Sequence, residues 1–184
     1  MKLFSWLQQQ AKCKIIALLG IAFVIFYAVM VLLTIFFLQT YHGYFDDFIY
    51  NVHFFYTPAA LYHSLGRLND ELRHLYPIIA AIDLVVAILY ASFGTLLTYK
   101  IISTVTNKLY YQKLSYLFIG AAVVNIVEDV ILSFIVIVYP SQFIWLAWFA
   151  SALTSTKLIC LALGFLVAMM FIIIWVNNAI LKKE

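Results

Sequence analysis

The chain has 184 residues, of which 66% are hydrophobic and 10% are charged. A soluble domain of this length cannot bury so much apolar surface, and this excludes a water-soluble enzyme or binding module. The formal charge of +3 comes mainly from lysines scattered over short segments between apolar blocks, so we expect no nucleic acid among the partners.

Residues 15–38 form the first long apolar block and contain no charged side chain. About 20 apolar residues span a bilayer as a helix, so this block predicts a first membrane span. The block is too long for the apolar core of a signal peptide, and no small-residue cleavage site follows it. We therefore expect the segment to be retained as a span.

Residues 39–74 form the outer loop, the only sizeable segment that we expect outside the membrane, and they are rich in aromatic side chains. Its stretch TPAALYHSLG carries the signals of a short helix, because Thr57 can cap it, Pro58 suits its first position and Gly66 can end it. We expect this helix to lie flat at the membrane interface, over the outer mouth of the bundle.

Three further apolar blocks predict spans at 75–98, at 114–139 and at about 148–176. Asn69 or Asp70 can cap the helix that contains the second span. The predicted fold class is therefore all-α. Residues 1–184 form a single integral membrane domain, a four-helix transmembrane bundle with a short interfacial helix in the outer loop.

Loop charges predict the orientation of the bundle. Lysines precede the first span, separate the second span from the third and follow the fourth, whereas acids outnumber arginines between the first two spans. By the positive-inside rule both termini face the cytoplasm, an N-in/C-in arrangement. We expect a multi-pass protein of the bacterial inner membrane or an equivalent membrane.

Ionisable side chains interrupt three of the predicted spans. Asp83 lies in the second span, the adjacent acids Glu128 and Asp129 in the third, and Lys157 in the fourth. Counting residues from the outer end of each helix places all of them at a similar depth, in the outer half of the bilayer. A charge in hydrocarbon costs about 2.5–3.5 kcal/mol on insertion scales. We therefore expect the lysine to face the acids within one layer.

Polar side chains accompany this layer at helical spacing, since Tyr90 shares a helix face with Asp83 and Asn125 precedes Asp129 by four residues. The candidates for binding a ligand or a proton are Asp83, Tyr90, Asn125, Glu128, Asp129 and Lys157, and the candidates at the outer mouth are Arg73 and Tyr76.

Motifs for established chemistries are missing from the sequence. It has no nucleophile motif, no HExxH motif and no phosphate-binding loop. The histidines of the outer segment also lack the close spacing that is typical of metal ligands. They are His42, His53, His63 and His74. We expect no catalytic residue, no metal and no cofactor. Whether the protein is an enzyme stays open, and a non-enzymatic role is favoured.

Several stretches follow one another in a characteristic order: YTPAALYHSLG, then LRHLY leading to Asp83 and Tyr90, then Glu128–Asp129, then TSTK ending at Lys157. This order, over most of residues 56–160, resembles a family of small four-helix integral membrane proteins of bacteria and archaea whose activity is not established. The chain departs from the family pattern at Asp129, where the family has asparagine, and at a Gly-Arg element, of which only Arg73 is present. The resemblance implies that the acid–lysine layer recurs, and it implies no activity.

Three functions are consistent with such a layer. The first is binding or translocation of a small solute, a proton or a lipid-like ligand, with Glu128 as the preferred proton-exchanging acid. The second is a membrane-embedded lipid-modifying enzyme, in which Asp83 and Glu128 act as acid and base and Tyr90 assists. The third is an accessory subunit of a membrane complex whose polar layer only fixes helix packing. The expected partners are the lipid bilayer, a lipid-like ligand, and further copies of the chain or a membrane complex.

Three acids against one lysine would give the layer a charge of −2 if all were ionised. We therefore predict that at least one of Asp83, Glu128 and Asp129 is protonated at neutral pH, because neighbouring buried carboxylates disfavour a second charge. Infrared spectroscopy of the carboxyl bands during a pH titration measures this. Three ionised carboxylates at neutral pH would contradict the prediction.

Overall fold

The structure is a computed structural model that describes residues 11–40 and 54–181. All regular elements in these ranges are helices: α2 (Cys13–Thr40), α4 (Pro58–Arg67), α5 (Asp70–Val105), α6 (Leu109–Gln112), the 3₁₀ helix η2 (Lys113–Tyr116), α7 (Leu117–Val138) and α8 (Ile144–Leu181). Four helical stretches are long and apolar enough to cross a membrane: Cys13–Phe37, Asp70–Val105, Leu109–Val138 and Ile144–Asn178. The predicted all-α four-helix bundle is confirmed, as is the multi-pass membrane character.

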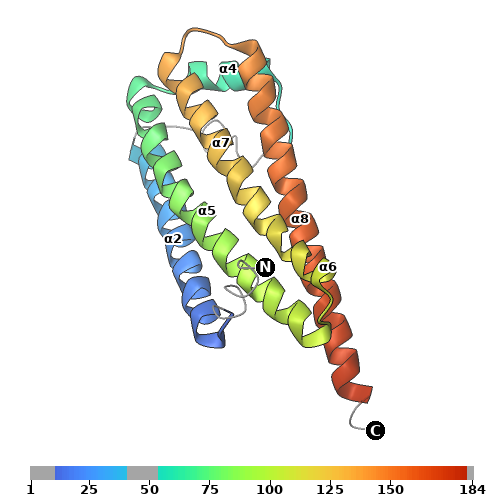
Figure 1. Cartoon of the computed structure of the whole chain (residues 1–184). Coiled ribbons are helices and arrows are strands. Elements are labelled where there is room, and N and C mark those ends of the chain that lie inside the picture. The colour runs from blue at the N-terminus through green and yellow to red at the C-terminus, as the bar shows by residue number, and fades with distance from the viewer. Residues whose placement is uncertain (1–10, 41–53, 182–184) are drawn as a thin grey trace.

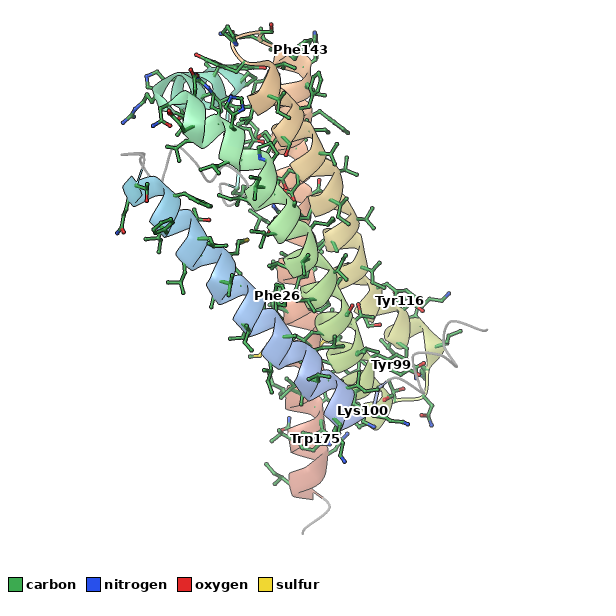
Figure 2. All side chains as sticks on the ribbon, turned by 90° about the vertical axis from the view of Figure 1, so that its left-hand side faces the viewer. Phe26, Tyr99, Lys100, Tyr116, Phe143 and Trp175 are labelled. Carbon is green, nitrogen blue, oxygen red and sulfur yellow. The ribbon has the colours of Figure 1, made fainter. Side chains whose placement is uncertain are left out.

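The four long helices run up and down in turn, and α4 lies across the end of the bundle where α7 passes into α8 (Figure 1). The helices α5, α7 and α8 pack against one another, whereas α2 packs chiefly on α5. Lys100 and Trp175 lie at the end of the bundle opposite Phe143 (Figure 2). The direction of the bundle relative to the two membrane faces stays a prediction, and residues 41–53 of the predicted outer loop lie outside the described ranges.

Local sequence signals explain where α4 begins and ends. Thr57 is the N-cap, since its hydroxyl accepts a hydrogen bond from the backbone N–H of Ala60 at 3.2 Å, and Pro58 occupies the first turn as predicted. The helix does not end at Gly66. It continues to Arg67, and Leu68, whose backbone is extended, ends it. Gly66 does not form a left-handed cap, since no described glycine has a positive φ.

The apolar side of α4 closes this end of the bundle. Leu61 and Leu65, one helical turn apart, are almost completely buried in a cluster with side chains of α5, α7 and α8. The backbone N–H of Phe143, just before α8, donates a hydrogen bond to the Tyr62 hydroxyl at 2.6 Å. Of the two candidates for capping α5, Asn69 is the N-cap, and its side chain accepts from the N–H of Leu72 at 2.9 Å.

Farther from α4, the ring of Phe118 on α7 lies between a glycine of α5 and a glycine of α8. A Cβ added to Gly94 would lie 2.5 Å from Cδ1 of Phe118, and one added to Gly164 would lie 2.9 Å from its Cε2. Small residues at helix interfaces allow this close approach in membrane bundles. The two glycines therefore form the space that the Phe118 ring fills.

We predict that Gly94→Ala destabilises the bundle by about 1–3 kcal/mol, the usual range for overpacking, because the new methyl group would meet the base of the Phe118 ring. Gly164→Ala should cost less, since it meets the far side of that ring. Gly120→Ala is the control, because a Cβ there meets nothing within 4 Å. Thermal unfolding midpoints in detergent test this order, and equal midpoints for Gly94→Ala and Gly120→Ala would contradict it.

Candidate functional site

A buried ion pair joins α7 to α8. Lys157 Nζ lies 2.6 Å from Glu128 Oε2, and Glu128 is completely buried. The other carboxylate oxygen of Glu128 accepts a hydrogen bond from the hydroxyl of Thr154, which precedes Lys157 by three residues and so shares its face of α8. Bonds to ionised groups are among the strongest in proteins, so this group of three side chains fixes the register between the two helices.

A second polar group joins α7 to α5. The side-chain nitrogen Nδ2 of Asn125 donates to Asp83 Oδ2 at 2.9 Å and to Asp129 Oδ2 at 2.8 Å. Asn125 and Asp129 are one turn apart on α7, and Asp83 reaches them from α5. Adjacent residues of a helix point about 100° apart, which explains why Glu128 faces α8 while Asp129 faces α5.

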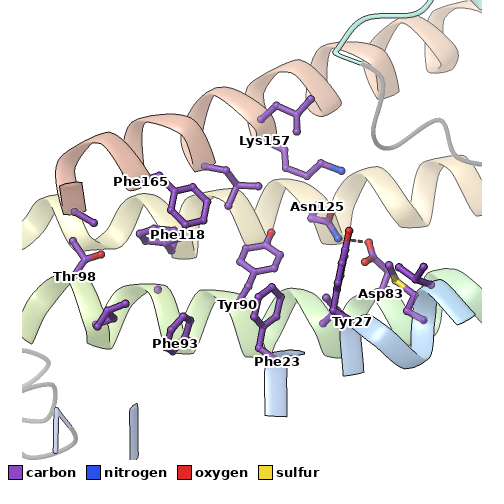
Figure 3. A pocket seen from close by; sticks show the side chains of 18 of the residues that line it. Phe23, Tyr27, Asp83, Tyr90, Phe93, Thr98, Phe118, Asn125, Lys157 and Phe165 are labelled. Atoms are coloured by element: carbon purple, nitrogen blue, oxygen red, sulfur yellow. Dashed lines mark hydrogen bonds between the residues drawn. The ribbon is translucent and has the colours of Figure 1, made fainter. Parts of the chain in front are cut away.

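A cavity of about 530 Å³ lies between α2, α5, α7 and α8, beside these polar groups. Asp83, Asn125 and Lys157 line one part of it, and the remainder is mostly apolar and aromatic (Figure 3). The apolar part includes Phe23, Phe93, Phe118, Leu161 and Phe165. Cavities of about 300–1,000 Å³ with a few convergent polar groups are typical of small-molecule sites.

The sequence-predicted candidates divide into two groups in the structure. Asp83, Tyr90, Asn125 and Lys157 line the cavity. Glu128 and Asp129 are buried and are not among the residues that line it, so each meets the cavity only through a partner side chain, Lys157 or Asn125.

Apart from Glu128 Oε2, which is ion-paired with Lys157, two polar atoms in this region have no hydrogen-bond partner among the described residues. They are the hydroxyl oxygen of Tyr90 and the Oδ1 oxygen of Asp129, and both atoms are buried. A buried polar group without a partner is costly and rare in folded proteins, so these two atoms call for an explanation.

The two outer-mouth candidates do not line the cavity. Arg73 donates to the backbone carbonyls of Leu65 and Leu68 at 2.9 and 3.0 Å. Its guanidinium also pairs with Asp70 and lies 4.8 Å from the ring centroid of Tyr139. Tyr76 is buried in the cluster beneath α4. Both residues therefore belong to the closed end of the bundle, where the hydrogen bonds of Arg73 stabilise the connection between α4 and α5.

Sequence reasoning missed the contribution of α2 to the cavity. Tyr27 and Thr34 both line it, and Tyr27 lies at the polar part, near Asp83 and Asn125 (Figure 3). A signal was present, because these are the only side chains with a hydroxyl in the block 15–38 and they are seven residues apart, which places them on one helix face. The aromatic wall formed by Phe118 and its neighbours had no such signal.

Metal binding stays untested by the structure. The described residues contain no group of three or more His, Cys, Asp or Glu side chains that could hold a metal ion. His42 and His53 lie outside the described ranges, so the expected absence of a metal site in the outer segment stays a prediction.

We predict that Lys157→Met destabilises the bundle by about 3–5 kcal/mol, because it leaves the Glu128 carboxylate buried without its counter-charge. Adding Glu128→Gln should recover most of the loss, since the neutral amide can still accept from Thr154. A double-mutant cycle on unfolding midpoints measures the coupling. Strictly additive effects of the two substitutions would show that the pair does not determine stability.

Searches against protein-family models, curated proteins and solved structures found no match to this chain. The family resemblance carried by the acid–lysine layer therefore stays a prediction. The directly observed features are four helices suited to a membrane, the buried Glu128–Lys157 ion pair and the cavity beside it. Function has to follow from the chemistry of that cavity.

Proposed function

We propose that this protein binds a single-chain, lipid-like amphiphile in the cavity between α2, α5, α7 and α8. The observation that carries the proposal is the division of the cavity into a small polar part and a larger apolar part. The head group would lie at Asp83, Asn125 and Lys157. The chain would lie along the apolar part, among side chains such as Phe118 and Phe165.

The closed end of the bundle favours entry of the ligand from the bilayer. The cluster beneath α4 fills the space between the helix ends with buried side chains such as Leu61, Leu65 and Leu72. By contrast, α2 is peripheral, and Ile16 and Thr34 are its only buried side chains among those described. Because α2 forms one wall of the cavity, we expect a lipid chain to enter beside this helix.

The geometry supports binding over the two alternatives. An enzyme that uses Asp83 and Glu128 as acid and base needs both carboxylates at the substrate. Glu128 does not line the cavity, and both of its oxygens are engaged by Thr154 and Lys157. An accessory subunit with a purely structural polar layer needs no cavity beside that layer.

We predict that Ala168→Phe prevents ligand binding, because Ala168 lines the cavity and a phenyl ring there would occupy the space of the chain. The matched control is Ala162→Phe, which lies on the same helix and faces outward. The probes are amphiphiles with one alkyl chain that carries a photoreactive diazirine, in three forms with a cationic, a neutral or an anionic head group. Labelled peptides are located by mass spectrometry.

The expected result is labelling of cavity-lining residues by at least one probe in the wild type and in Ala162→Phe, and labelling at least about tenfold weaker in Ala168→Phe. Unchanged thermal midpoints for both variants would show that the loss is not due to unfolding. If no probe labels a cavity-lining residue in the wild type, or if Ala168→Phe is labelled like the control, the proposal is wrong.

A further inference from the structure

The charges around the polar part of the cavity do not cancel. Lys157 is paired with Glu128, and these two charges neutralise each other. Asp83 and Asp129 both accept hydrogen bonds from the neutral amide of Asn125. The net charge of the four ionisable groups is therefore negative, both when the two aspartates are ionised and when they hold one proton between them.

No other charged group on the surrounding helices reverses this balance. Among the described residues that line the cavity, Asp83 and Lys157 are the only charged ones. The wall formed by α2 contributes the hydroxyl groups of Tyr27 and Thr34 and no ionisable group that is charged at neutral pH. The field that a ligand meets at the polar part is thus that of an excess carboxylate in an apolar surrounding, where charges interact strongly.

The hydrogen bonds in this region leave two buried polar atoms without a partner. The buried oxygen Oδ1 of Asp129 receives no hydrogen bond from the described residues. Among the described residues that line the cavity, Asn125 is the one with a side-chain amide, and its Nδ2 already donates to two carboxylates. The Tyr90 hydroxyl is also without a partner and lines the cavity. Asp129 does not line the cavity, so a ligand there meets Asp83 and the Tyr90 hydroxyl, and N–H donors on its head group can bond to both.

An aromatic ring lies where a cation would be held. Tyr27, from α2, lines the cavity beside Asp83, and Tyr90 lies about two helical turns from Asp83 along α5, toward the apolar part (Figure 3). The face of an aromatic ring attracts a cation within about 6 Å of its centre, and more strongly where water is excluded. An anionic head group would instead meet Asp83, and Lys157, the lysine among the described lining residues, is already paired with Glu128.

We infer that the head group of the ligand is cationic, an alkylammonium or another protonated amine, and that it binds Asp83 beside Tyr27. This inference rests on the proposed function, since it names the chemical class of ligand for the same cavity. It makes Asp83 the residue that selects the head group, while the apolar wall accepts the chain.

The test compares the three photoreactive probes, which share one chain and differ only in the head group: a primary ammonium, a hydroxyl or a sulfate. Binding to the full-length protein is measured in a non-ionic detergent, so that the micelle itself has no charge preference. We expect the ammonium probe to bind at least about tenfold more tightly than either of the others. In Asp83→Asn the ammonium and hydroxyl probes should bind alike.

The matched control is Glu71→Gln, which removes an exposed carboxylate from the same helix far from the cavity and should leave the preference unchanged. The comparison of probes on the wild type does not depend on whether Asp83→Asn folds. Equal binding of the three probes, or tighter binding of the sulfate, with cavity residues still labelled, would overturn the cation preference and leave the proposed function standing. Absence of labelling in the cavity by every probe would overturn both.

Discussion

The placement of one carboxylate in an apolar bundle determines much of the surrounding geometry. A charge in hydrocarbon is tolerated when a counter-charge and hydrogen bonds meet it, and Lys157 with Thr154 supplies both to Glu128. Once Glu128 faces α8, the rotation of α7 about its own axis is set. Asp129 must then face α5, where Asn125 connects it to Asp83. The polar part of the cavity is in this sense a consequence of the ion pair behind it.

The same constraint explains why some polar residues line the cavity and others are buried behind it. Glu128 and Asp129 are buried behind the cavity, and they orient the side chains that face it. Lys157 belongs to both sets, because its ammonium closes the ion pair while the side chain also lines the cavity. These contacts hold α5, α7 and α8 together. The helix α2, which carries no charge within its apolar block, forms the remaining wall of the cavity.

Much of the fold follows from the sequence, because the length of an apolar block and the caps of a helix are local properties. Thr57, Pro58 and Asn69 marked the beginnings of α4 and α5, and counting along the helices placed Asp83, Glu128, Asp129 and Lys157 in one layer. Which acid would meet the lysine was not predictable, since adjacent acids differ only in direction and that direction depends on the neighbouring helices. The inward face of an all-apolar helix is also hidden, because lipid and protein interior select the same side chains. This is why Phe118 gave no signal, whereas Tyr27 and Thr34 did.

The short connection between α7 and α8, residues 139–143, has a consequence for biosynthesis. As a separate segment, α7 would bring two carboxylates into the bilayer and α8 would bring one ammonium group, and each would enter without its counter-charge. Joined by five residues, the two helices reach the membrane together, and the Glu128–Lys157 pair can form as they enter. The helical hairpin, and not the single helix, is therefore the smallest piece of this chain in which the lysine is neutralised, and it is the natural unit of membrane insertion.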